Sequence, residues 1–168
     1  MTALHGLSET ILEGKDNVAA DNASWGTDLQ LLGSLQWQNE RQVHDLHAAA
    51  GDLALYSGQA NLMQALYLRF LTRVGELAPL GHPAYGSRLH ELLGEPNTAL
   101  TRQRARMFVL QALEDEPRVV QVLSVEVTPA PADPVRLKIA LTADVRVEGI
   151  IQRLNLVFPF FLEGGWRI

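Results

Sequence analysis

Apolar and polar residues alternate strictly through part of the C-terminal third of the chain, from Val135 to Val147. Because successive side chains of a strand point to opposite faces of a sheet, this period of two predicts a strand with one buried face. A shorter alternation after Pro117 predicts a preceding strand, interrupted at Gln121, whose inward row is Val119, Leu123, Val125 and Val127.

A tight turn at Glu148-Gly149 would fold the chain back on this strand as a hairpin. In that register Leu141 lies opposite Leu156, and Asp144 lies opposite Arg153. Cross-strand pairs of these kinds stabilise a sheet by about 0.2–1 kcal/mol each. A shift of one residue would bring the apolar set onto the polar face, so the pattern predicts this register and no other.

Upstream of the strands, apolar residues recur with the period of a helix. A first helix is expected from about Gly58 to Val74, because one stripe holds Leu62, Met63, Leu66, Phe70 and Val74. Ser57 can cap this helix and Gly75 can end it. A short helix is expected from Arg88 to Leu93.

A third helix is expected from about Thr98 to Glu114. It is apolar on nearly every side from Met107 to Leu113, which predicts a position between the first helix and the sheet. This order of elements predicts an α+β fold, with two to three helices before a small antiparallel sheet of three or four strands. Residues 52–168 would form the domain, and residues 1–51 a flexible or partner-ordered arm that can include a short helix.

The composition is that of a globular domain. The chain has 168 residues, of which 47% are hydrophobic, a net charge of −5 and no cysteine. The charge gives no electrostatic basis for binding nucleic acid, and the absence of cysteine excludes disulfides and thiolate metal sites. No apolar run approaches the roughly 20 residues that span a bilayer, and no signal peptide is evident. We therefore expect a protein made in the cytoplasm, without nucleic-acid or membrane partners.

The segment from Arg69 to Asn97 joins a helix end, a turn, a short helix and a Glu-Pro step. It resembles the segment that marks the gene 25-like baseplate wedge family of contractile phage tails and related injection systems. The matching residues are Leu71-Thr72, Gly75-Glu76, Tyr85-Gly86-Ser87, Leu89, Leu92-Leu93 and Glu95-Pro96. The resemblance implies a structural protein, present in many copies in a ring-like particle, that seats the contractile sheath on the baseplate. Its implied partners are wedge subunits, the sheath protein, and inner-tube or hub proteins.

The resemblance also implies a surface for the wedge. In the family a Glu-Pro-Arg type of motif lies at the contact with the wedge's helical core bundle. Here Asn97 replaces the arginine, and Arg102, Arg104 or Arg106 could supply its charge. The Glu95-Pro96 step is equally explained as a structural turn before the third helix, and the two roles do not exclude each other. The expected wedge-side residues are Glu95, Pro96, Asn97, Arg102 and Leu68, and the expected structural turn comprises Gly75, Glu76, Tyr85, Gly86 and Ser87.

A second surface is expected at the C-terminus, where FPFFLEGGWRI is rich in large apolar side chains. Pro159 has no N–H group and predicts an edge strand, and an unprotected edge can accept a strand from another chain. This agrees with the resemblance, which implies that sheath subunits are joined by exchanged strands. The expected sheath-side residues are Leu154, Leu156, Phe158, Phe161 and Trp166.

Two other functions compete with this interpretation. The family has long carried a lysozyme label, and a glycosidase needs two carboxyl groups about 5–9.5 Å apart, one with a raised pKa. The candidates are Glu76, Glu91, Glu95 and a run at a helix end that is expected to be solvated, Glu114, Asp115 and Glu116. The third function is a general adaptor domain. Structural roles are favoured, so we expect no enzymatic activity, no catalytic residue and no cofactor.

No metal site is expected either. His44 and His47 have the spacing with which two imidazoles on a helix can share a metal ion. No third ligand lies near them in the sequence, and a solvated helix face explains the pair more simply.

Overall fold

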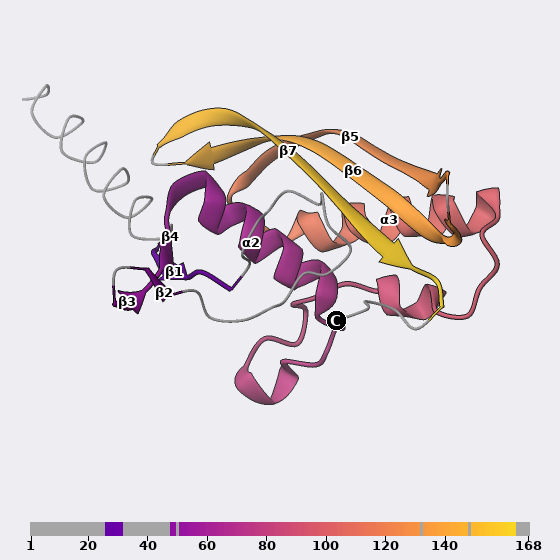
Figure 1. Ribbon diagram of the computed structural model, residues 1–168, viewed down its shortest axis with the longest axis horizontal. Coiled ribbons are helices and arrows are strands. Elements are labelled where there is room, and N and C mark those ends of the chain that lie inside the picture. The colour runs from indigo at the N-terminus through magenta and orange to yellow at the C-terminus, as the bar shows by residue number, and fades with distance from the viewer. Residues whose placement is uncertain (1–25, 32–47, 50, 132, 148, 164–168) are drawn as a thin grey trace, which may run out of the picture.

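The computed structural model describes residues 26–31, 48–49, 51–131, 133–147 and 149–163. Three antiparallel strands form the main sheet, in the spatial order β5 (Val119–Ala130), β6 (Asp133–Val147) and β7 (Ile150–Phe161). Two helices, α2 (Gly58–Leu71) and α3 (Ala99–Glu114), cover one face of this sheet (Figure 1). The predicted α+β class, with helices before a small antiparallel sheet, is confirmed.

The hairpin of β6 and β7 has the predicted register. Leu141 pairs with Leu156 and Asp144 with Arg153, and no residue is inserted anywhere along the ladder. The Arg153 guanidinium donates to the Asp144 carboxylate at 2.7 Å, on the face of the sheet that the helices leave open. Alternation over many residues specified this register because any slip would have exposed the apolar row.

Strand β5 departs from the predicted alternation, because its register against β6 shifts between Val119 and Gln121 and again between Val122 and Ser124. The two extra residues are Val120 and Leu123. The prediction that Leu123 belongs to the inward row is wrong: its side chain is 41% exposed. Each bulge adds one residue and reverses the parity of the positions that follow, which a strict period of two cannot anticipate.

Helix α2 ends at Leu71, three residues before the predicted end. Thr72 already has an extended conformation, with ψ of 136°, so Val74 lies outside the helix and is exposed. Ser57 occupies the N-cap position but its side chain forms no capping hydrogen bond. The periodic stripe up to Phe70 is otherwise buried as predicted, apart from Met63, which is partly buried.

The remaining helical segments include two 3-10 helices, η1 (Ala78–Leu80) and η2 (Leu89–Leu92). The second corresponds to the predicted short helix, and the first was not predicted. Helix α3 begins after Thr98, whose hydroxyl oxygen accepts the Thr101 N–H at 3.2 Å.

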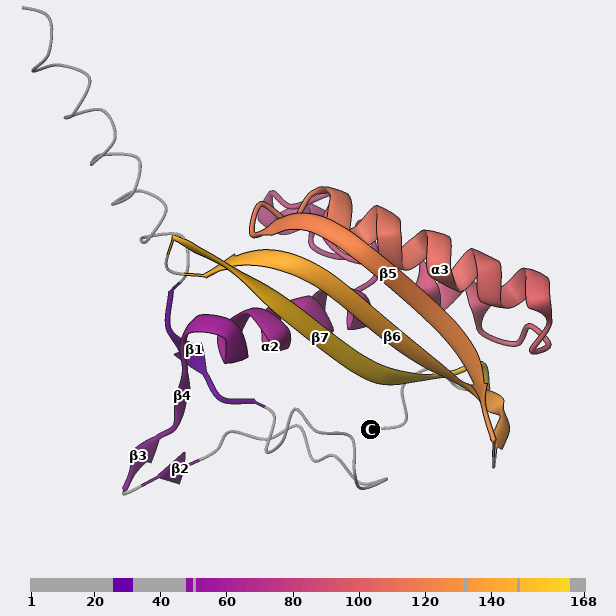
Figure 2. The ribbon, with the colours of Figure 1, turned by 90° about the horizontal axis from the view of Figure 1, so that it is seen from above.

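Helices α2 and α3 lie side by side under the sheet, with α3 alongside β5 and α2 alongside β7 (Figure 2). The ring of Phe70 on α2 stacks on Phe158 of β7, with the centroids 5.0 Å apart. The expectation that α3 lies between the first helix and the sheet is therefore wrong. Met107 and Gln111 are exposed on α3, so this helix keeps one face in solvent.

A buried ion cluster joins the ends of the two helices. Glu116 is only 4% exposed and forms ion pairs with Arg118 and with Arg69, the latter at 3.2 Å. Arg69 also donates to the backbone oxygen of Ala112 near the end of α3, at 3.1 Å. The expectation that Glu116 belongs to a solvated run is wrong, because two guanidinium groups neutralise it inside the protein.

The part of the predicted arm that the structure describes contacts the domain. Strand β1 (Asp28–Leu29) pairs with β4 (Leu55–Tyr56), and β2 (Ala48–Ala49) pairs with β3 (Asp52–Leu53). The Gln64 side chain on α2 donates to the Leu29 oxygen and accepts the N–H of residue 31, both at 2.9 Å. The rest of the predicted arm, including His44 and His47, lies outside the described residues.

Candidate partner-binding surfaces

The segment that carries the family resemblance begins with a loop from Thr72 to Ser87, closed at its base by backbone hydrogen bonds. The N–H of Ser87 donates to the Thr72 oxygen at 2.8 Å, and the N–H of Val74 donates to the Ser87 oxygen at 3.2 Å. The N–H of Arg73 donates to the Glu76 carboxylate at 2.9 Å. The chain thus leaves α2 and returns to the same point, as in an Ω-loop.

Two neighbouring residues fasten this loop to the body of the domain. Gly86 has a φ of 117°, and a Cβ atom there would lie 2.7 Å from the carbonyl carbon of Arg73, so the close approach of the two backbones requires glycine. The Tyr85 ring lies 4.6 Å from the guanidinium carbon of Arg69. Burial raises the pKa of Tyr85, and the charge of Arg69 opposes that shift. All five expected turn residues lie in this loop, and Gly75 has the left-handed conformation that lets the chain turn after α2.

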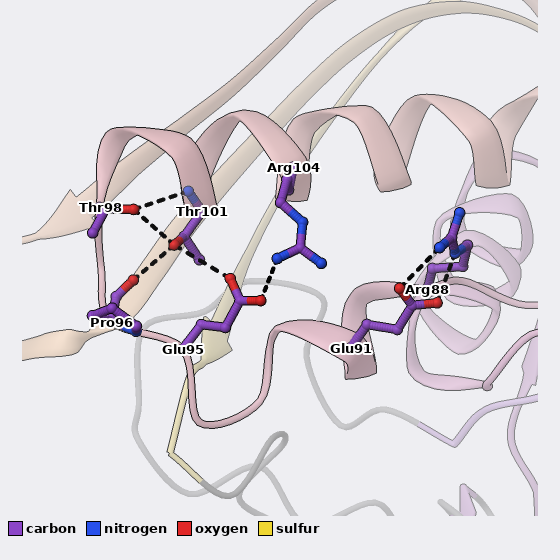
Figure 3. A network of polar contacts seen from close by, with 7 residues as sticks. All are labelled: Arg88, Glu91, Glu95, Pro96, Thr98, Thr101 and Arg104. Atoms are coloured by element: carbon purple, nitrogen blue, oxygen red, sulfur yellow. Dashed lines mark hydrogen bonds and ion pairs between the residues drawn. The ribbon is translucent and has the colours of Figure 1, made fainter.

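The Glu-Pro step lies at the corner between η2 and α3. The Glu95 carboxylate forms an ion pair with Arg104, which reaches down from α3 (Figure 3). The Thr101 hydroxyl lies 3.5 Å from the other Glu95 oxygen and donates to the Pro96 oxygen at 2.7 Å. Of the three arginines that could supply the family's charge, Arg104 is the one whose ion pair with Glu95 the structure describes.

Asn97 bridges this corner to the sheet. Its amide nitrogen donates to the backbone oxygen of Pro134, at the start of β6, at 2.8 Å. Its side-chain oxygen accepts from Arg102 at 2.7 Å. The position that carries arginine in the resembling family therefore holds a hydrogen-bond bridge here, with the Arg102 guanidinium bonded to it.

A second ion pair lies beside the first. Arg88 donates two hydrogen bonds to the Glu91 carboxylate, at 2.7 and 2.9 Å (Figure 3). The guanidinium carbons of Arg88 and Arg104 lie 4.9 and 5.7 Å from the centroid of the Phe108 ring. The hydrogen bonds from Arg88 lower the pKa of Glu91. A glycosidase acid needs a raised pKa, so the shift at Glu91 has the wrong sign for that role.

Three of the other carboxylates that were considered for catalysis form contacts within the domain. They are Glu76 in its own loop, Glu95 with Arg104, and Glu116 with its two arginines. Glu114 and Asp115 are exposed at the end of α3. Within the described ranges, no group of three or more histidine and carboxylate side chains could hold a metal ion. None of the helices described is both long and apolar enough to cross a membrane.

Strand β7 is one edge of the main sheet, and no described strand pairs with its outer side. The backbone oxygen of Arg153 accepts a hydrogen bond from the Gln59 side chain at 3.2 Å, so Arg153 directs its backbone groups away from β6. In an unshifted antiparallel ladder, alternate residues share this direction. The backbone groups of Asn155 and Val157 therefore also face outward, as does Pro159, whose missing N–H disrupts no bond to β6.

Several residues that were expected to contact the sheath lie in the core. The side chains of Leu154, Leu156 and Phe158 are buried against the helices, so they do not form an accessible surface. The predicted register places Leu156 opposite Leu141 on the apolar face, so the assignment of this row to a partner conflicted with the hairpin pattern. Phe161 is half-buried, with the guanidinium carbon of Arg136 at 5.9 Å from its ring centroid, and Trp166 lies outside the described residues.

On the wedge side, Glu95, Asn97 and Arg102 come together at one corner, while Leu68 lies half-buried on α2. Sequence reasoning missed the outward backbone groups at Asn155 and Val157. Pro159 carried the signal for them, because residues an even number of positions from an edge proline share its outward direction. Nothing in the sequence marked Gln59 as a partner of the strand.

Among solved structures, the chain is similar to a protein from Geobacter sulfurreducens that is described as a candidate tail lysozyme. The two share 28% sequence identity, and the likeness covers 62% of this chain and 90% of that one, with a TM-score of 0.53. No protein-family model matches the chain, and no curated protein matches it. The chain is thus similar in fold and sequence to a protein whose description places it in a tail.

Proposed function

We propose that this chain is a structural component of the baseplate of a contractile tail or of a related injection system. Its likeness to the Geobacter protein supports a role in a tail. The resemblance of the segment from Leu71 to Pro96 supports the finer assignment to the baseplate. In this role the chain links a wedge subunit to the first ring of the sheath.

The wedge-side surface is the corner formed by Glu95, Pro96 and Asn97, with Arg102 beside it and Leu68 on α2. The Glu95–Arg104 pair and the Asn97 bridge hold this corner in one shape before a partner arrives. A preformed surface loses little conformational entropy on binding, which favours association. Inner-tube or hub proteins are further partners on this side.

The unshifted outer edge of β7 is the single observation that carries the sheath-side assignment. Its backbone groups at Asn155 and Val157 face outward, and the exposed Val157 side chain, at 40%, flanks the position of an added strand. The opposite edge strand, β5, is interrupted by two bulges, which disfavour pairing. A sheath strand added at β7 would extend the sheet by one. Many copies in a ring would make such contacts persistent even if each were weak.

The test is a proline at an outward-facing position. Val157→Pro removes an N–H that β6 does not use, so the domain should fold as Pro159 already allows. In cells that produce the particle, we expect Val157→Pro to leave baseplates intact but without sheath, while the control Val157→Thr gives sheathed tails. Particles are counted by electron microscopy, and the folding of both variants is compared by thermal unfolding.

Sheaths of normal length and number with Val157→Pro would contradict the assignment of this edge. Wild-type chain that is absent from every tail particle would contradict the proposed function as a whole.

The description of the Geobacter protein as a lysozyme favours one alternative, a peptidoglycan hydrolase. It would require purified protein to clear a suspension of cell walls, and Glu76→Gln or Glu95→Gln to abolish the clearing. Since Glu95 is paired with Arg104 and Glu76 with the backbone of its own loop, we expect no clearing by the wild-type chain.

A further inference from the structure

The loop between Thr72 and Ser87 presents an apolar tip to solvent. Leu80 is 72% exposed, the largest exposed fraction among the large apolar side chains of the described residues. Ala78, Pro79, Pro83 and Ala84 are exposed beside it in the sequence. From Leu77 to Ala84 the tip contains no aspartate, glutamate, lysine or arginine, although a fifth of the whole chain is charged. The loop projects below the helices, away from the sheet (Figure 1).

Internal hydrogen bonds hold this tip in one shape. Within η1 and the turn that follows, Leu80 N–H donates to the Leu77 oxygen at 3.0 Å, and His82 N–H donates to the same oxygen at 3.1 Å. Gly81, with a φ of 88°, lets the chain reverse there. Pro79 and Pro83 restrict the backbone further. The tip is therefore ordered by its own contacts, without the help of the core.

The base of the loop is fixed as firmly as the tip. The backbone of Ser87 is hydrogen-bonded to Thr72 and to Val74. The backbone of Gly86 lies too close to Arg73 to leave room for a side chain. Leu80 is thus carried at a set position relative to α2. A rigid segment that exposes a leucine gains nothing in the stability of its own fold, since apolar side chains lower the free energy only when they are removed from water.

We infer that this loop is a docking element whose tip inserts Leu80 into an uncharged, apolar pocket of another protein. The rigidity of the loop favours a preformed pocket, because little entropy is lost on binding. The lack of lysine and arginine at the tip, where His82 is the one ionisable side chain, argues against a nucleic acid or an anionic membrane as the partner. This surface is separate from the Glu-Pro corner and from the β7 edge, and the inference does not depend on the proposed function.

The experiment places a photo-crosslinking amino acid, benzoylphenylalanine, at position 80 of the full chain in the cells that produce it. We expect one discrete adduct with a different protein, identified by mass spectrometry. That protein is then produced separately and titrated with the purified chain. We expect Leu80→Ser to weaken binding by about ten- to a hundredfold, the equivalent of burying one leucine side chain.

Ile150→Ser is the matched control, because Ile150 is also a large exposed apolar side chain, at 62%, but lies at the β6–β7 turn. It should bind as the wild type does, and both variants should unfold at the wild-type temperature. Equal binding by Leu80→Ser and the wild type would overturn the inference. The absence of an adduct, or adducts only within the chain or with a second copy, would overturn it too.

Flotation with phosphatidylcholine vesicles tests whether the tip binds a lipid surface instead of a protein pocket. If the wild-type chain floats with the vesicles and Leu80→Ser does not, the inference is overturned. A captured partner that is no tail protein, but shows the expected loss with Leu80→Ser, would support the docking loop and speak against the proposed function. The two proposals can therefore fail independently.

Discussion

At the scale of single residues, two glycines with similar backbone conformations differ in what surrounds them. Gly86 and Gly94 have φ values of 117° and 83°, in a region that other residues rarely adopt. A Cβ atom at position 86 would meet the carbonyl carbon of Arg73 at 2.7 Å, whereas at position 94 it would meet nothing within 4 Å. Conformational strain is therefore common to both sites, and steric overlap with a neighbouring backbone belongs to Gly86 alone.

Alanine substitutions at these two glycines separate the two effects. Gly94→Ala should lower the free energy of unfolding by about 1–2 kcal/mol, the cost of a left-handed conformation for a residue with a Cβ atom. Gly86→Ala should cost about 3 kcal/mol or more, because the loop base must also open. Unfolding in urea gives both values, and equal losses at the two sites would show that the close approach to Arg73 is absent in solution.

At the scale of elements, the two long helices begin in different ways. The Thr98 hydroxyl accepts the Thr101 N–H at 3.2 Å at the start of α3. At the start of α2, the Ser57 side chain makes no such bond although serine is a favoured capping residue. Residue type alone therefore does not show which helix start depends on a cap.

This difference leads to a paired prediction. Thr98→Ala should lower the free energy of unfolding by about 1 kcal/mol, because an N–H at the start of α3 loses its partner. Ser57→Ala should change it by only about 0.3 kcal/mol, the range of ordinary surface substitutions. Both values come from denaturant unfolding at neutral pH. A loss at Ser57 as large as that at Thr98 would mean that Ser57 caps α2 in solution.

Elements with a long regular pattern could be predicted from the sequence, and elements that depend on distant contacts could not. The β6–β7 register was correct because Leu141, Asp144 and their neighbours permit only one alignment. Strand β5 was placed correctly, but the break in its alternation at Gln121 does not show that Val120 and Leu123 are inserted as bulges. Helix α2 was extended too far because its end depends on Ser87, a residue that meets Thr72 only in the folded chain.

The residues of the candidate sites also divide into those that a local pattern predicts and those that depend on distant contacts. The resemblance assigned Glu95 and Asn97 to a wedge contact, which stays a prediction; in the structure they bind different partners, Arg104 and the Pro134 oxygen. The choice of Arg104 among three arginines could not be made, because its partner lies outside α3 and no helical spacing connects them. Leu156 and its neighbours were assigned to a partner from the resemblance, although the predicted register already placed Leu156 opposite Leu141 on the apolar face that the helices cover.

At the scale of the whole molecule, the Glu116 cluster connects parts that are far apart in the sequence. Arg69 near the end of α2 reaches Glu116 after α3, and its guanidinium also contacts the Tyr85 ring in the loop. The Arg69 Nε atom is buried and has no hydrogen-bond partner in the described structure. The buried guanidinium of Arg69 and the partly buried guanidinium of Arg118 thus share the Glu116 carboxylate.

Glu116→Gln should therefore lower the free energy of unfolding by about 3–5 kcal/mol, since it leaves buried positive charge without compensation. Glu91→Gln is the control, because it removes a carboxylate from the exposed pair with Arg88 and should change stability little. Thermal and urea unfolding report both. A mild effect of Glu116→Gln, similar to that of Glu91→Gln, would indicate that water reaches the cluster.

The difference between the two edge strands, β5 and β7, affects how copies of the chain could polymerise through their sheets. A sheet that elongates without limit needs units that can join at both edges, and in this molecule the two bulges in the first half of β5 disfavour pairing at one of them. The bulges therefore disfavour an endless fibre of copies joined through their main sheets. In the proposed role, a unit with one regular edge would start a polymer of another protein and set the direction in which it extends.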